Sequence, residues 1–213
     1  MKLESIFGTR VPAAEMTARR MAFSLSALLM ALAAVLLIIS IFTPYWKMTL
    51  LAPQYPKGLV ALTYVNRLEG DIQEIDTLNH YIGMRPLGEA ASFEKSISIA
   101  GIVALSLLLL STIFVHTRWA ALLALPALLF PALFLGDLAF WLNHFGQNLD
   151  PRAPLSSSIQ PFTPPVLGRG GVAQFNVVAE MDTGLILACI ASLFIIAGLF
   201  FHRRAYKPLV DAS

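Results

Sequence analysis

The sequence predicts an all-α integral membrane protein with four transmembrane helices and a small extracytoplasmic α+β cap. One observation behind this class is composition: 57% of the residues are hydrophobic and only 13% are charged, whereas soluble proteins carry about a quarter of their residues as charged side chains. The second is that four stretches carry almost no charge. These stretches are residues 21–43, 97–115, 119–142 and 184–201.

The lengths of the four stretches match a bilayer. At a rise of 1.5 Å per residue a helix over each would be roughly 27 to 36 Å long, and the hydrocarbon core of a membrane is about 30 Å thick. The first stretch is longer than the apolar part of a secretory signal and ends at Pro44 without a cleavage site. We therefore expect it to be kept as a transmembrane helix.

The distribution of lysine and arginine predicts the orientation. Eight of the 15 basic residues lie in three short pieces, namely residues 1–20, Arg118 and residues 202–213. Residues 44–96 and 143–183 hold the other seven, together with nine carboxylates. Because short cytoplasmic segments hold the excess of positive charge, we expect both termini to be cytoplasmic and both long loops to lie outside.

The first outer loop, residues 44–96, predicts a strand followed by a helix. Residues 59–68 are rich in Val, Leu, Thr and Tyr, which favour strands. A helix over residues 72–82 follows, and Asp71 with Glu74 has the spacing of an N-cap and its partner. The apolar side of this helix needs a surface to pack on, either the chain's own strands or a partner protein. That side consists of Ile72, Ile75, Leu78 and Ile82.

The second outer loop, residues 143–183, predicts one further strand over residues 172–179. A hairpin of two strands alone is marginal in water. We therefore expect this strand to pair with residues 59–68, and the helix of the first loop to pack on the pair. Together these elements would form the extracytoplasmic cap.

Soft and borderline metal ligands occur in the same loops. His80 and Met84 have the i, i+4 spacing of one helical face, and His144 follows the third apolar stretch. Thioether and imidazole groups together suit copper, so these three residues are a possible copper site. Asp76 and Asp137 are the candidates for orienting them. The alternative is that all five are ordinary surface or packing residues.

Other classes of function lack a motif. The sequence contains no nucleophile elbow, no glycine-rich phosphate loop and no H-E-x-x-H, so we do not expect an enzyme. It has no basic patch of the kind that binds nucleic acid. The one cysteine, Cys189, lies in the fourth apolar stretch, which rules out an intramolecular disulfide.

Several short segments resemble a known family. A-P-Q-Y-P-K-G-L at residues 52–59, L-N-H-Y-I-G-M at residues 78–84 and N-L-D-P at residues 148–151 are similar to the signature of a family of small bacterial membrane proteins. That family is associated with the gene neighbourhoods of nitrous oxide reductase and periplasmic copper handling. In its pattern a histidine precedes N-L-D-P directly, whereas this chain has Gln147 there and its histidine at His144.

The resemblance implies a protein of the bacterial inner membrane that helps a copper enzyme. We therefore expect an accessory or assembly subunit of a copper-dependent or respiratory membrane enzyme system, with the lipid bilayer and a larger membrane or periplasmic complex as its partners. It would bind or deliver copper on the extracytoplasmic side. The alternative is a purely structural, metal-free subunit of a multisubunit membrane oxidase or oxygenase, which would dock through Ile72, Ile75, Leu78 and Ile82.

Overall fold

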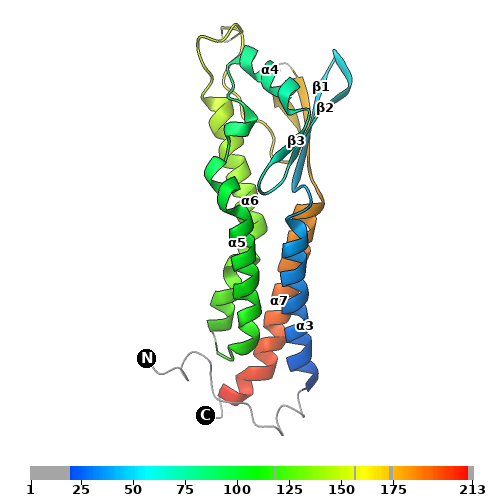
Figure 1. Cartoon of the computed structure of the whole chain (residues 1–213), viewed down its shortest axis with the longest axis vertical. Helices are drawn as coiled ribbons and strands as arrows, with labels where there is room; N and C mark the ends of the chain where they lie inside the picture. The colour runs from blue at the N-terminus through cyan, green and yellow to red at the C-terminus, as the bar shows by residue number, and fades with distance from the viewer. Residues whose placement is uncertain (1–19, 118, 156, 173–174, 211–213) are drawn as a thin grey trace. The chain divides into compact units, whose positions relative to one another are not determined.

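The computed structural model describes residues 20–117, 119–155, 157–172 and 175–210. Four long helices occur in this part of the chain (Figure 1): α3 (Arg20–Ser40), α5 (Ser92–Ser111), α6 (Trp119–Gln147) and α7 (Thr183–Val210). Each of them is long and apolar enough to cross a bilayer. The predicted set of four apolar helices is therefore confirmed.

The bounds of these helices differ from the predicted stretches by up to nine residues, the largest difference being at the end of α7. Helix α5 begins at Ser92 and continues into a short 3-10 turn, η2 (Thr112–Phe114). Helix α6 extends to Gln147, so His144 is helical and does not belong to a loop. The predicted N-terminal tail, apart from Arg20, lies outside the described residues, as does Arg118.

The chain divides into two compact units. One contains the described residues up to Ile39, Ala100–Pro131 and the described residues from Leu187 onward. The other contains Ser40–Ile99 and Ala132–Ile186. The first unit is helical, and the second holds a β-sheet together with the adjoining ends of the long helices.

Small residues allow close packing in the helical unit. Buried alanines occur on α3, α6 and α7, and they let helix backbones approach one another where lipid supplies no hydrophobic force. They are Ala33, Ala34, Ala120, Ala124, Ala127, Ala188 and Ala191. Two serine hydroxyls add bonds between helices: Ser26 donates to the carbonyl of Gly198 at 3.1 Å, and Ser192 to that of Leu128 at 3.0 Å.

An aromatic cluster joins α7 to the connection between α5 and α6. The ring of Tyr206 stacks on His116 with centroids 4.5 Å apart, and it also contacts the rings of His202 and Phe23. His202 is buried, and its Nε2 lies 2.9 Å from the carbonyl oxygen of Val115. Because a carbonyl only accepts, Nε2 carries the proton of this bond.

The second unit is built on a five-stranded antiparallel sheet in the order β3-β2-β1-β5-β4. Its strands are β1 (Trp46–Ala52), β2 (Tyr55–Thr63), β3 (Leu68–Gly70), β4 (Gly168–Val172) and β5 (Phe175–Met181). The central strand β1 pairs Met48 with Ala61 of β2 and with Ala179 of β5. The β-structure is larger than the predicted pair of strands, so the protein is helix-rich but not all-α.

Both predicted strands need correction. Residues 59–68 do not form one strand, because the N–H of Tyr64 bonds the carbonyl of Arg67 at 2.9 Å and closes a turn between β2 and β3. Residues 172–179 span the end of β4 and most of β5, with residues 173–174 outside the described part. The two strands also do not pair with each other, because β1 lies between β2 and β5.

The predicted helix of the first loop is confirmed as α4 (Ile72–Ile82), but its predicted cap is wrong. The Asp71 side chain makes no bond to the start of α4; its Oδ2 accepts the N–H of Val60 at 2.8 Å. The helix ends at Gly83, whose φ of +81° is a left-handed conformation that favours glycine. A further 3-10 turn, η1 (Leu87–Glu89), leads on toward α5.

One face of the sheet forms the core of this unit. Along β1 the residues Trp46, Met48, Leu50 and Ala52 are buried in strict alternation. Helix α4 and the last turns of α6 supply the apolar residues that cover them, among them Ile75, Ile82, Leu142 and Phe145. We call this side of the sheet the covered face.

A substitution of His202 tests the aromatic cluster. Replacing His202 with Phe keeps a ring of similar size but removes the N–H, which leaves the carbonyl of Val115 without this donor in an apolar setting. We expect the free energy of unfolding in detergent to fall by about 1–3 kcal/mol. The matched control His80→Phe changes an exposed side chain and should stay within about 0.5 kcal/mol of the wild type. Equal stability of both variants would contradict the role of His202.

Candidate functional site

The apolar residues of α4 that were predicted to dock a partner lie against the chain's own sheet. Ile75 and Ile82 are buried, with exposed fractions of 1% and 5%. Ile72 and Leu78 are half-buried and pack against the same core. In the described structure the apolar side of α4 therefore packs on the chain's own strands and not on a partner protein.

His80 and Met84 do not form the expected pair on one helical face. Because α4 ends at Gly83, Met84 leaves the helix, and its N–H bonds back to the carbonyl of Asn79 at 2.9 Å. The Met84 side chain is 6% exposed and packs in the core of the covered face. His80 is exposed to solvent. The i, i+4 spacing alone did not reveal this, although the predicted helix over residues 72–82 already ended before Met84.

His144 lies among aromatic rings on α6. Its ring is parallel to that of Phe140, with centroids 5.8 Å apart, and meets Trp141 edge to face at 5.9 Å. Its Nδ1 lies 3.4 Å from the side-chain nitrogen of Asn148. Stacking and this amide therefore account for the position of the imidazole.

The two carboxylates that were predicted to orient these histidines are Asp76 and Asp137. The Oδ1 of Asp76 accepts the N–H of Leu87 at 2.8 Å, which holds the start of η1. Asp137 is half-buried on α6, two turns before His144. Within the described residues no group of three or more His, Cys, Asp or Glu side chains is close enough to hold a metal ion. This finding does not include methionine thioethers, so the copper site of His80, Met84 and His144 stays a prediction.

Two of the three segments that carry the family resemblance, residues 78–84 and 148–151, meet in the folded chain. The N–H of Asp150, in N-L-D-P, bonds the carbonyl of Gly83, in L-N-H-Y-I-G-M, at 2.8 Å. Leu155 bonds the carbonyl of Tyr81 at 3.0 Å. A Cβ on Gly83 would lie 2.6 Å from the Asp150 carbonyl oxygen. These segments thus supply a contact by which the second loop is held against α4.

The side of the sheet opposite the covered face is a surface that the sequence analysis did not predict. Alternation in a strand turns every second residue away from the core, and here those residues are half-buried or exposed. We call this side the open face; it consists of Lys47, Thr49, Leu51, Val60, Leu62, Val178 and Glu180. Thr49 is central, because it lies opposite Val60 and opposite Val178. The alternating pattern of residues 46–52 was the available signal.

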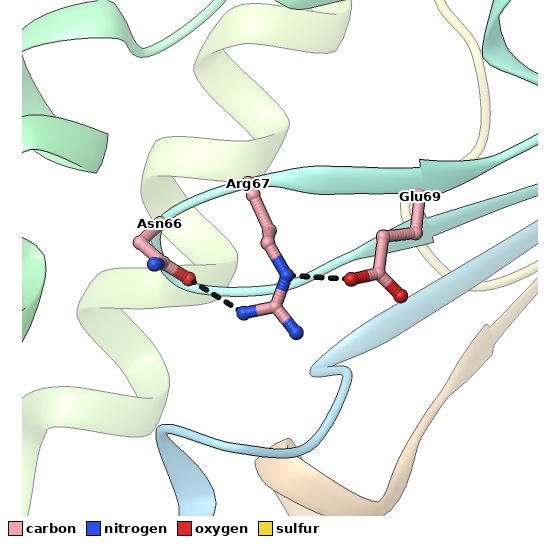
Figure 2. A network of polar contacts seen from close by, with 3 residues as sticks. All are labelled: Asn66, Arg67 and Glu69. Carbon is pink, nitrogen blue, oxygen red and sulfur yellow. Dashed lines mark hydrogen bonds and ion pairs between the residues drawn. The ribbon is translucent and has the colours of Figure 1, made fainter.

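A polar network lies at the turn between β2 and β3 (Figure 2). The Nε of Arg67 donates to Oε1 of Glu69 at 2.6 Å, and Nη1 donates to Oδ1 of Asn66 at 3.2 Å. The guanidinium carbon lies 3.8 Å from the centroid of the Tyr64 ring. The bond from Arg67 lowers the pKa of the Glu69 carboxyl below its ordinary value. The pair therefore stays ionised at neutral pH.

Comparisons of the chain with protein-family models, with curated proteins and with solved structures find no match. The chemistry and geometry of the described residues are therefore the basis for assigning a function.

Substitutions of Met84 separate a structural role from a ligand role. Met84→Ala removes a buried side chain and should lower the free energy of unfolding by about 2–5 kcal/mol. Met84→Leu nearly conserves the volume and should cost less than about 1.5 kcal/mol. We expect the Leu variant to leave Cu(I) affinity, measured by competition with a colorimetric chelator, unchanged. A stable Leu variant with weakened Cu(I) binding would show that the thioether is a ligand.

Proposed function

We propose that the protein is an accessory or assembly subunit of a bacterial copper-dependent or respiratory membrane enzyme system. The observation that carries this proposal is the open face of the sheet. Among the described residues, no open-face side chain of the five-stranded sheet belongs to the core that α4 and α6 cover, and the chain also has helices that are long and apolar enough for a membrane. A subunit that holds a larger partner needs such a surface.

The proposed location is the inner membrane, with both termini in the cytoplasm and the sheet outside. The support is the sequence distribution of charge, since eight of the 15 basic residues lie in the two tails and at Arg118. An even number of spans also returns the chain to the side on which it began. The sheet would then face a partner in the membrane or in the periplasm.

The composition of the open face supports protein binding. Thr49 lies between the aliphatic side chains of Val60 and Val178, and the open face therefore offers apolar contact area beside charged groups, a mixture that protein interfaces also have. The neighbouring row across the sheet consists of Leu62, Lys47 and Glu180, in which the two charged residues are opposite each other. The sequence resemblance supports a copper enzyme as the partner, with the metal held by that partner.

A charge placed on the open face tests the main proposal. We expect Thr49→Arg to reduce the amount of partner recovered after cross-linking in native membranes by about tenfold or more, because about 1.4 kcal/mol of lost affinity is tenfold. The matched control Gln73→Arg adds the same charge to an exposed position of α4 and should leave recovery unchanged. Equal loss in both variants, or loss in neither, would contradict docking through the open face.

Copper delivery is the second form of the proposal, because His80 keeps an exposed imidazole. His80 and His144 would then act as separate ligands and not as one site with Met84. Cu(I) titration of the purified protein tests this form, with His80→Ala and His144→Ala measured against the wild type. Weaker binding in either variant supports delivery, whereas three equal curves would leave the open face as the only candidate surface.

A further inference from the structure

The end of the sheet that carries the turn between β2 and β3 is tied to the ends of two candidate spans. Strand β1 begins six residues after α3 ends, and α7 begins two residues after β5 ends. Trp46, the first residue of β1, lies opposite Thr63, the last residue of β2, and opposite Met181, the last residue of β5. Ser40 and Thr183, where α3 ends and α7 begins, belong to the same compact unit as the sheet.

Three backbone bonds hold this end together. The N–H of Tyr45 bonds the carbonyl of Thr63 at 2.7 Å, and the carbonyl of Tyr45 accepts the N–H of Asp182 at 3.0 Å. The N–H of Gly184, in the first turn of α7, bonds the carbonyl of Pro44 at 2.7 Å. The last residue of β2 is therefore at the level where α3 and α7 leave the apolar layer.

The turn of residues 64–67 continues from this point. Because β2 and β3 are antiparallel, their connection leaves the sheet at the end where β1 starts. The connection between β1 and β2, at Pro53 and Gln54, lies at the other end. The seven residues of β1 separate the two turns by roughly 20 Å at 3.3 Å per residue.

We infer that the β2–β3 turn lies on the membrane surface and that Arg67 binds the phosphate of a phospholipid headgroup there. This inference rests on the membrane insertion that is part of the proposed function. The carrying observation is that an arginine with a fixed orientation and a 44% exposed side chain occurs at the level where the candidate spans end. A planar guanidinium with several donors suits phosphate oxygens.

The neighbours of Arg67 set its direction and leave donors free. Nε is directed to Glu69 and Nη1 to Asn66, but a guanidinium has five N–H donors, so others are available to a ligand. In Figure 2 the second terminal nitrogen points away from both partners. The Tyr64 ring supports the cation from one side, and a ring with a polar tip suits the interface between lipid and water.

The charge of the turn indicates that the lipid does not have to be anionic. Arg67 and Glu69 cancel, so the turn has no net charge to attract an anionic surface. Binding then depends on a single directed contact with phosphate, which phosphatidylcholine offers as well as an anionic lipid does. We therefore expect the contact in vesicles of phosphatidylcholine alone.

A distance measurement tests the phosphate contact. The full chain, with its arginines labelled with carbon-13, is reconstituted into phosphatidylcholine vesicles, and dipolar coupling between guanidinium carbons and phosphorus is recorded by solid-state NMR. We expect Arg67→Gln to remove part of the coupled signal. The matched control Arg169→Gln changes an exposed arginine of β4 and should leave the signal unchanged. Arg169 lies opposite Val178, which is three residues before the last residue of β5.

A depth measurement tests the position of the turn independently. Cys189 is the single cysteine of the chain, so Cys189→Ala allows one fluorophore to be placed at Asn66→Cys or at Gln54→Cys. We expect a quencher on the lipid headgroup to quench the label at position 66 strongly and the label at position 54 hardly at all. Circular dichroism of each variant confirms that the fold is intact.

The outcomes that overturn the inference are distinct. Equal quenching at positions 66 and 54, or a coupled signal that is undiminished in Arg67→Gln, would exclude a headgroup contact. A coupled signal that disappears when inorganic phosphate is washed out would assign the site to free phosphate. Shielding of position 66 only in native membranes, and not in pure lipid, would assign it to a protein. If alkaline carbonate released the chain from membranes, insertion itself would fail, and with it this part of the proposed function.

Discussion

The buried side chain of Tyr45 connects the sheet to the end of α3, the start of α7 and the middle of α6, and the second unit depends on this junction. Its hydroxyl lies 2.6 Å from Oγ of Ser40, the last residue of α3, and its ring lies 4.8 Å from that of Phe134 on α6. The backbone of α7 approaches so closely that a Cβ on Gly184 would lie 2.4 Å from the ring. Tyr45 also bonds Thr63 and Asp182 through its main chain. One residue therefore positions β1, β2 and β5 relative to the helix ends in this unit.

Much of the polar chemistry in the loops serves to close the second unit. Asp71 holds Val60, Asp76 holds Leu87, and the indole N–H of Trp46 bonds the carbonyl of Val166 at 2.6 Å. Each of these bonds satisfies a backbone group that would otherwise be costly to bury. The L-N-H-Y-I-G-M segment also serves the fold of this unit: Gly83 ends α4, and the side chain of Met84 packs in the core. Of the residues that suggest a metal site in the sequence, Met84 is thereby used for packing.

The two faces of the sheet differ in what covers them. The covered face of the sheet is occupied by α4 and α6, whereas the open face has no such cover among the described residues. The β2–β3 turn, with the ion pair of Arg67 and Glu69, lies at the end of the sheet where α3 ends and α7 begins. A subunit of this form would be oriented by lipid at that end and would offer the open face to a partner.

The sequence by itself determined the four apolar helices, because bilayer thickness requires a long uncharged stretch, and it determined α4, because its apolar period and Gly83 are local signals. It did not determine strand β1, the order of the sheet or the burial of Met84. Those depend on pairing between residues 46–52 and residues more than a hundred positions away, and no local pattern specifies which strand becomes the neighbour of another. Only the tertiary structure decided that the helix of the first loop covers the chain's own sheet, because a side chain is buried by whatever surface the rest of the fold brings to it.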